Sequence, residues 1–143
     1  KPVNHEGRVY QLLGLAWAGE PAAKLQPLAK ALIAEQRPDG GWTQLPKLNS
    51  DAYATGQAVY ALRVAAGLDN AHPAVEQGRR YLLATQLADG TWHVKRRAFP
   101  FQPTMDSGFP HGRDSWISAA GTSWAVMALS LPDKSGEELA GTH

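Results

Sequence analysis

The feature that most constrains the fold is a short segment that occurs twice, as QRPDGGW at 36–42 and QLADGTW at 86–92. Both copies carry Gln, Asp-Gly and Trp at the same spacing, fifty residues apart. The match extends to the preceding residues, where KALIAEQRPDGGW (30–42) aligns with RYLLATQLADGTW (80–92). A repeat of this length indicates that each copy is one structural unit, and that neighbouring units pack against one another.

A second element is repeated in alternation with the first. The same offset aligns VYQLLGLA (9–16) with VYALRVAA (59–66), and TGQAVYAL (55–62) resembles TSWAVMAL (122–129). The last offset is 67 residues, so 17 additional residues lie between Trp92 and the final copy. We therefore expect an inserted loop within 93–114.

Each repeated element has the pattern of a helix. Tyr53, Tyr60 and Val64 recur at helical spacing among many alanines. Pro73 stands where a helix can begin without its N–H, and the Asp-Gly pair after the second copy favours a helix end, because Gly accepts a left-handed backbone. The pattern predicts no strand, and it predicts five helices at about 5–19, 22–36, 51–68, 73–87 and 115–131.

This order predicts an all-α domain made of two and a half helical hairpins. A single hairpin cannot cover its own apolar face, so we expect the hairpins to stack. Gly56 and Gly121 allow two of the predicted helices to approach closely. We expect one domain over 1–131 and a flexible tail over 132–143.

Charge and composition exclude several functions. The 14 basic and 13 acidic residues give a net charge of +1, which offers no general attraction to nucleic acid. HVKRR at 93–97 is the only dense charge run, and we expect it to be a solvated loop. Without cysteine there are no thiolate metal sites, and no apolar run approaches the ~20 residues that span a bilayer. We expect no cofactor and no metal.

Two segments carry a resemblance to a known family. GRRYLLATQLADGTW (78–92) resembles the QW repeat of squalene–hopene and oxidosqualene cyclases, and AKALIAEQRPDGGW (29–42) resembles it with Ala31 in place of the usual aromatic residue. The resemblance covers about residues 8–130 and implies an incomplete α/α toroid, with 22–36 and 73–87 as outer helices and the others as inner helices.

The resemblance also implies that the motif is architectural. Its Gln ties a helix end to a neighbouring helix, and its Trp packs on that junction. A Gln amide can bond orphan backbone groups at a helix terminus, and an indole adds a large apolar surface with one N–H. The structural residues implied in this way are Gln36, Gly40, Trp42, Gln86, Gly90 and Trp92.

The family's catalytic acid has no counterpart in this chain. Those cyclases use an Asp-x-Asp-Asp segment to start the reaction, whereas every Asp here is isolated. A full toroid also needs more hairpins than this sequence provides. We therefore interpret the chain as a non-catalytic binding or interaction module, or as a fragment of a larger protein. The alternative is part of a squalene–hopene-cyclase-like triterpene cyclase whose acid lies outside this chain.

Other toroid enzymes offer a weaker alternative. QRPDGGWTQ (36–44) locally resembles family-10 pectate lyases, which use an Arg base and acidic calcium ligands, and the corresponding set here is Arg113 with Asp106 and Asp114. The β-subunits of protein prenyltransferases and the complement-type thioester domains share the toroid. Both need a cysteine, which this chain lacks.

Aromatic residues on the predicted inner helices form the first candidate site. They could line a cavity for an apolar or isoprenoid ligand, and the structural alternative is that they pack the core. Where such a surface is exposed, we expect the rest of a larger parent chain or a second copy to cover it. The candidate ligand-binding residues are Tyr10, Tyr53, Tyr60, Trp116 and Trp124.

The inserted loop FPFQPTMDSGFPHGRDSW (99–116) is the second candidate site. Its Pro, Gly and Phe residues favour an ordered Ω-like excursion. Asp106, His111, Arg113 and Asp114 could perform acid–base chemistry or bind a metal there. In the structural alternative, Asp114 or Ser115 caps the helix that begins near Trp116.

Overall fold

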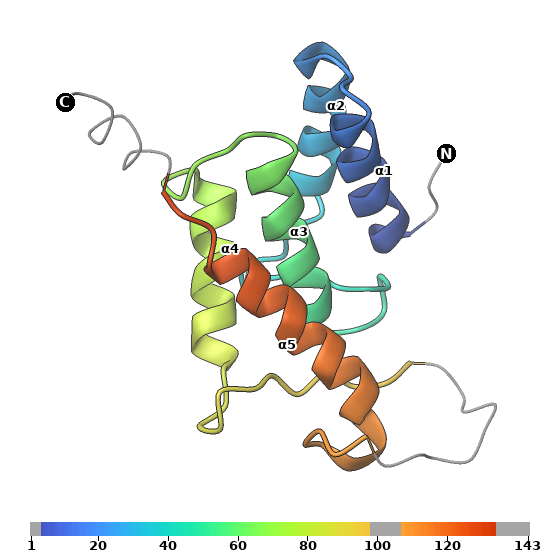
Figure 1. Ribbon diagram of the computed structural model, residues 1–143, viewed down its shortest axis with the longest axis vertical. Coiled ribbons are helices and arrows are strands. Elements are labelled where there is room, and N and C mark those ends of the chain that lie inside the picture. The colour runs from blue at the N-terminus through green and yellow to red at the C-terminus, as the bar shows by residue number, and fades with distance from the viewer. Residues whose placement is uncertain (1–3, 98–106, 134–143) are drawn as a thin grey trace.

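The computed structural model describes residues 4–97 and 107–133, which form five α-helices and no strand (Figure 1). A short 3₁₀ helix, η1 (Gly112–Asp114), precedes the last of them. Every helix begins within one residue of its predicted start, so the all-α class and the five helices are confirmed. The α-helices are α1 (His5–Trp17), α2 (Ala22–Ile33), α3 (Ala52–Val64), α4 (Pro73–Thr85) and α5 (Ser115–Leu129).

The helix starts are fixed by local chemistry. The Asn4 side chain accepts a hydrogen bond from Gly7 N at 2.8 Å, and Asp51 accepts one from Ala54 N at 2.8 Å. Each bond satisfies an N–H that has no partner within the helix. Pro73 opens α4, where its fixed φ suits a first helical residue.

The helices end two to four residues earlier than predicted. In α3 the predicted end is residue 68, but the helix stops at Val64 and Gly67 takes a φ of +71°. Leu68 N then bonds back to Leu62 O at 3.1 Å. This left-handed turn uses residues that share the helical hydrophobic pattern, so periodicity alone extends the helix too far. Gly19 ends α1 in the same manner, with Glu20 N bonded to Leu15 O at 3.1 Å.

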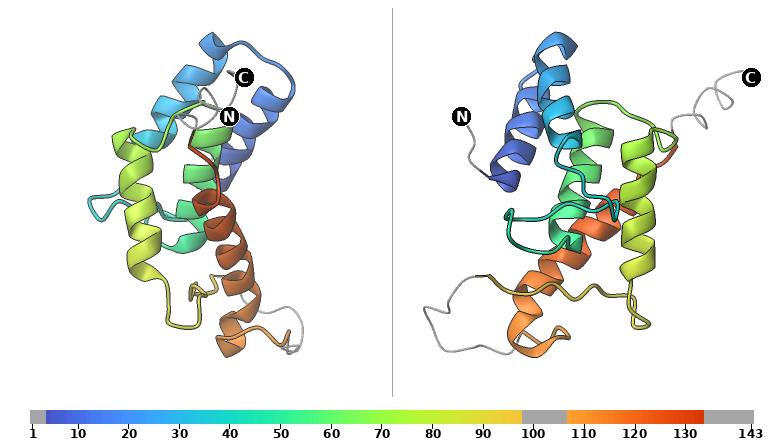
Figure 2. Two further views of the ribbon diagram at one scale, coloured as in Figure 1. Left: turned by 60° about the vertical axis from the view of Figure 1, so that its left-hand side comes forward. Right: turned by 180° about the vertical axis from the view of Figure 1, so that it is seen from behind.

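The helices form two layers. α3 is central and packs against α1, α4 and α5, while α2 packs on α1. In the left view of Figure 2, α2 and α4 lie on one side and α1 and α5 on the other. The inner helices α1, α3 and α5 therefore alternate along the chain with the outer helices α2 and α4. The arrangement is a stack of two and a half helical hairpins, an incomplete α/α toroid.

Two glycines allow close packing inside the domain. A Cβ at Gly121 would lie 2.6 Å from the side chain of Val94, and one at Gly78 would lie 2.5 Å from Val59. These glycines admit larger neighbours, which are fully buried. The core is aliphatic with two indoles, and its largest fully buried apolar side chains include Val9, Leu12, Leu13, Leu32, Trp42, Val59, Leu62, Val75, Leu82 and Trp92.

Among the described helices, none combines the length and apolar character required for a membrane span. The predicted tail, 132–143, lies outside the described residues from 134 onward.

Candidate functional site

The first QW copy joins α2 to α4. Gln36 Nε2 donates to Gly40 O at 2.8 Å and to Ala74 O, in the first turn of α4, at 2.9 Å. The Trp42 indole N–H donates to Leu32 O in α2 at 2.8 Å, and the ring is fully buried. Gly40 has a φ of +84°, which only glycine adopts without strain. The motif's side chains therefore bond backbone carbonyls at helix ends.

The second copy repeats the tryptophan contact but not the neighbouring helix. The Trp92 indole donates to Leu82 O at 2.8 Å, matching the first copy. Gln86 Nε2 donates to Gly90 O at 3.0 Å, and within the described residues it has no bond to a further helix. Gln86 is exposed, whereas Gln36 is half-buried. We call the QW segments 36–42 and 86–92 the first and second joints. The Gln and Trp side chains of the second joint bond only within their own hairpin, and among the described residues its Gln has no bond to a following helix.

Three aromatic residues meet between the inner helices. Trp124 on α5 packs edge-on against Tyr60 on α3, with ring centroids 5.7 Å apart, and against Tyr10 on α1 at 6.4 Å. Edge-to-face contacts of this kind stabilise aromatic pairs. Tyr10 and Tyr60 occupy equivalent positions in the repeat, so the pattern places both on one surface.

Tyr53 extends this surface towards the start of α1. Its hydroxyl donates to Glu6 at 2.6 Å. Burial raises the pKa of Tyr53, and the adjacent Glu6 carboxylate raises it further. The phenol therefore stays protonated and acts as a hydrogen-bond donor. Arg97 Nη2 lies 3.6 Å from the second Glu6 oxygen.

The same helices leave large apolar side chains uncovered. Trp17 is 67% exposed and Trp116 is 61% exposed. We call these residues, with the three that pack together and Tyr53, the aromatic wall: Tyr10, Trp17, Tyr53, Tyr60, Trp116 and Trp124. It contains all five predicted ligand-binding residues, some packed together and others open to solvent.

The inserted loop is tied to the second joint by its histidine. His111 Nε2 lies 2.8 Å from the hydroxyl of Thr91, and its ring stacks on that of His93 with centroids 5.0 Å apart. His111 has a φ of +83°, which is uncommon for a residue with a side chain. The loop thus returns to the QW segment before α5 begins.

Asp114 does not cap α5 through its side chain, contrary to one of the predicted alternatives. Its carboxylate instead accepts a hydrogen bond from Arg96 N at 3.1 Å and lies 2.8 Å from His93 Nε2. Desolvation opposes ionisation, but these hydrogen bonds outweigh it and lower the pKa of Asp114. The Asp114 carboxylate therefore bonds to the extended segment after Trp92 and not to the first turn of α5.

The predicted group in the inserted loop is only partly assembled. His111 and Asp114 both contact His93, whereas Arg113 is exposed and Asp106 lies outside the described residues. Within residues 4–97 and 107–133, no three His, Asp or Glu side chains are arranged to hold a metal ion. A carboxylate that orients an imidazole can assist proton transfer, and His93 and Asp114 form such a pair.

The charge run 93–97, predicted to be a solvated loop, is partly buried. Val94 is 1% exposed, and the Ser118 hydroxyl accepts a hydrogen bond from its backbone N–H at 3.0 Å. Lys95 points outward while Arg96 is half-buried. The alternating burial of an extended segment explains the difference, since every second residue faces the core.

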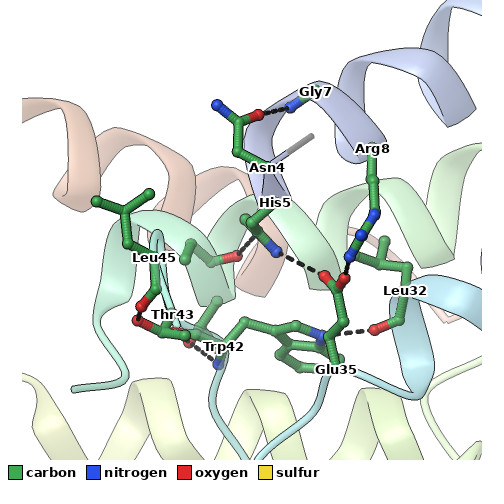
Figure 3. Close-up of polar contacts among 11 residues, drawn as sticks. Asn4, His5, Gly7, Arg8, Leu32, Glu35, Trp42, Thr43 and Leu45 are labelled. Carbon is green, nitrogen blue, oxygen red and sulfur yellow. Dashed lines mark hydrogen bonds and ion pairs between the residues drawn. The ribbon is translucent and has the colours of Figure 1, made fainter. Parts of the chain in front are cut away.

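A polar cluster at the start of α1 was missed by sequence reasoning. His5 is 5% exposed and donates from Nε2 to Ala54 O at 2.9 Å, while its Nδ1 lies 3.6 Å from Glu35. Figure 3 shows that His5 and Arg8 both point to the Glu35 carboxylate, which forms an ion pair with Arg8. A pocket of ≈ 300 Å³ adjoins this cluster.

Burial lowers the pKa of His5, outweighing its hydrogen bond to Ala54 and the nearby Asp51 and Glu6 carboxylates, so the imidazole is neutral near pH 7. One sequence signal could have found it. His5 stands four residues before Val9, on the stripe that packs α1 against its neighbours. A polar residue at an apolar position is a candidate for a buried hydrogen bond.

The fold and its repeated contacts define a class of protein. Alternating inner and outer helices, joined by repeated Gln and Trp contacts to helix-end carbonyls, are typical of QW-repeat toroids. The family model of the squalene-hopene cyclase C-terminal domain matches residues 3–140. The chain therefore belongs to the squalene-hopene cyclase C-terminal domain family. No curated protein and no solved structure matches the chain.

Proposed function

We propose that the chain is a non-catalytic, cyclase-like repeat module that binds a further helical hairpin, supplied by a longer parent chain or by a second copy. One observation carries the proposal. Gln36 bonds to Ala74 on the following outer helix at 2.9 Å, while Gln86, its repeat equivalent, has no such partner among the described residues. The Gln86 amide can therefore donate a hydrogen bond to the first turn of a further helix.

The surroundings of the two joints support this interpretation. A Cβ at Gly40 would lie 2.7 Å from Gln77 O on α4, whereas the described chain leaves the space at Gly90 open. Leu83 and Leu87 beside the second joint are 59% and 42% exposed. Gln86 Nε2 has a second N–H besides the one bonded to Gly90 O. With these apolar side chains beside it, that N–H suits contact with the first turn of another helix, where a carbonyl oxygen can accept through its second lone pair.

The aromatic wall is the second surface that a further hairpin would cover. Trp17 and Trp116 within it are 67% and 61% exposed. Aromatic side chains are enriched where proteins meet partners. An apolar or isoprenoid ligand is the other occupant that this surface suits, because aromatic faces bind apolar and cationic groups.

The chain has no acid of the type that starts cyclisation, which supports a non-catalytic role. Asp51 begins α3, but its carboxylate accepts hydrogen bonds from Ala54 N at 2.8 Å and from Gln44 at 2.7 Å. Burial raises the pKa of Asp51, and these hydrogen bonds counteract part of that effect. The side chain is engaged as a helix cap.

Association is the direct test. Sedimentation velocity of the chain should detect a self-associated species, or binding of a synthetic α4 peptide (residues 71–86) that carries the surface closing the first joint. Leu87→Lys should abolish the association, whereas Leu45→Lys, at a residue 39% exposed on another connection, should preserve it. A strictly monomeric chain that ignores the peptide would contradict the proposal.

Catalysis is tested separately. Detergent-dispersed squalene incubated with the chain should be recovered unchanged by gas chromatography and mass spectrometry. Cyclised hydrocarbon formed by the chain alone would overturn the non-catalytic assignment.

Family membership favours one alternative, in which the chain is part of a triterpene cyclase whose acid lies outside it. The parent reading frame would then encode an Asp-x-Asp-Asp segment. If that segment is absent from the parent, this alternative is removed.

A further inference from the structure

A pocket of ≈ 450 Å³ lies where the connections that follow the two QW segments meet. One wall is formed by residues 47–51, after the first QW segment, and the other by His93, Lys95 and Arg96, after the second. We call it the inter-joint pocket. It uses no residue of the aromatic wall or of the second joint, so it is independent of the hairpin-binding function proposed above.

The first wall is preformed. The Thr43 hydroxyl donates to Leu45 O at 2.8 Å and lies 3.1 Å from Leu48 O, and the Arg37 guanidinium also donates to Leu48 O. Asp51 N bonds to Trp42 O at 3.0 Å, which closes the connection onto the buried indole residue. These bonds hold the backbone that carries Lys47, so its position does not depend on a ligand.

The second wall is fixed equally well. Val94 N donates to the buried Ser118 hydroxyl at 3.0 Å, and that hydroxyl lies 3.2 Å from Val94 O. Arg96 N donates to Asp114 at 3.1 Å. Because Val94 points into the core, the adjacent Lys95 points outward. Arg96 is half-buried and also lines the pocket.

The lining carries two lysine charges that the described protein does not neutralise. Lys47 and Lys95 are exposed and Arg96 is half-buried, and among the described residues none of the three forms an ion pair. Salt bridges elsewhere in the described chain use other cations. The pocket therefore concentrates cationic groups in a chain whose net charge is only +1.

The two neighbouring carboxylates are already occupied. Asp51 accepts hydrogen bonds from Ala54 N at 2.8 Å and from the Gln44 amide at 2.7 Å. Asp114 lies 2.8 Å from His93 Nε2 and accepts from Arg96 N. Asp114 acts electrostatically on Arg96, but neither carboxylate pairs with Lys47 or Lys95, so an incoming anion meets two uncompensated lysines.

We propose that the inter-joint pocket binds a small phosphorylated molecule, with its phosphate held by Lys47, Lys95 and Arg96. A guanidinium can bind a phosphate through two hydrogen bonds, and two ammonium groups add point charges that match a dianion. The cavity is larger than an inorganic phosphate requires and lies within the size range of small-molecule sites, so an organic group has room beside the anion. A concave, preformed site also distinguishes it from the extended basic surface that binds nucleic acid.

Isothermal titration calorimetry with inorganic diphosphate tests the proposal. The chain should bind diphosphate, and Lys47→Gln and Lys95→Gln should each weaken binding by about tenfold, as expected when a charge-assisted hydrogen bond is lost. Lys24→Gln is the matched control, because Lys24 is exposed, does not line the pocket and pairs with Glu20 at 2.7 Å. Circular dichroism should show that all three variants remain folded.

Backbone amide shifts provide the location. On adding diphosphate, shifts should change for residues 47–51 and 93–96 and not for α2. Absence of binding at millimolar diphosphate would overturn the proposal, as would equal weakening by Lys24→Gln or shift changes spread over the surface. A duplex oligonucleotide that binds more tightly than diphosphate at equal phosphate concentration would also overturn it, because the site would then serve a polyanion.

Discussion

The backbone of Gly56 on α3 lies directly against that of Trp124 on α5: a Cβ built on Gly56 would be 2.7 Å from the carbonyl carbon of Trp124 and 2.8 Å from the nitrogen of Ala125. Both obstructing atoms belong to a backbone, so they cannot move aside as a flexible side chain would. The central helix pair of the stack therefore depends on the absence of one side chain.

Gly56→Ala is expected to lower the free energy of unfolding by about 1–3 kcal/mol, because the two helices must separate to admit the methyl group. Gly14→Ala is the matched control, since that glycine lies in α1 and a methyl group there would meet nothing within 4 Å in the described chain. It should raise stability by up to about 1 kcal/mol, through helix propensity. Urea unfolding followed by circular dichroism measures both, and equal effects at the two positions would contradict the packing argument.

The two buried indoles, Trp42 and Trp92, should contribute similarly to the free energy of unfolding. Trp42→Phe and Trp92→Phe each remove a hydrogen bond of 2.8 Å to a helix-end carbonyl and leave part of the ring's space empty. We expect each to cost about 1–3 kcal/mol. Trp17→Phe, at a residue 67% exposed, should change the urea midpoint little. A large effect at Trp17 with none at Trp42 would reverse the assignment of structural and surface tryptophans.

The two glutamines should differ, although they occupy equivalent positions in the repeat. Gln36→Ala removes hydrogen bonds to Gly40 O and Ala74 O, and we expect a loss of about 1–2 kcal/mol. Gln86→Ala removes one exposed bond to Gly90 O and should cost about 0.5 kcal/mol or less. Thermal or urea unfolding of the two variants decides the matter. Equal losses would indicate that Gln86 has a partner equivalent to Ala74.

Stability should depend on pH through His5. Its folded-state pKa lies below the ordinary value of 6.5 because the imidazole is buried, so the unfolded chain takes up the proton first as pH falls. The stabilising contribution is therefore complete above about pH 6.5 and is lost progressively below that value. His5→Gln keeps an N–H donor for Ala54 but does not titrate.

Urea midpoints measured from pH 8 to pH 5 test this dependence. The difference in stability between the original chain and His5→Gln should shrink or reverse as pH falls. Taking the difference cancels the titration of groups that both chains share and that do not act on His5. A difference that stays constant across this range would exclude His5 as the source.

The helices were predictable in part because several of their starts carry a strong local signal. Pro73 and the capping Asp51 set the beginnings of α4 and α3, and local chemistry is visible in sequence. The helix ends were less predictable. Leu68 N bonds to Leu62 O across a glycine turn, and the residues involved still follow the helical hydrophobic pattern.

The candidate sites were predictable only in part, because their contacts cross long sequence distances. Tyr10 and Tyr60 were found through their equivalence in the repeat, but their common contact with Trp124 required the fold. Asp114 was expected near a helix start, yet its carboxylate binds His93, twenty-one residues earlier. No local pattern encodes that pairing, since it depends on how the inserted loop returns to α5.

The bond from Gln36 to Ala74 gives the stack a direction. The Gln at the end of the α1–α2 hairpin donates to a carbonyl in α4, the outer helix of the following hairpin. By this rule a hairpin is stabilised by the hairpin that follows it in the chain. The free energy of local unfolding should therefore decline along the chain towards Gln86, which has no hydrogen bond to a following helix among the described residues. In a longer array of hairpins with this hydrogen bond at every joint, unfolding would begin at the last joint and proceed towards the first.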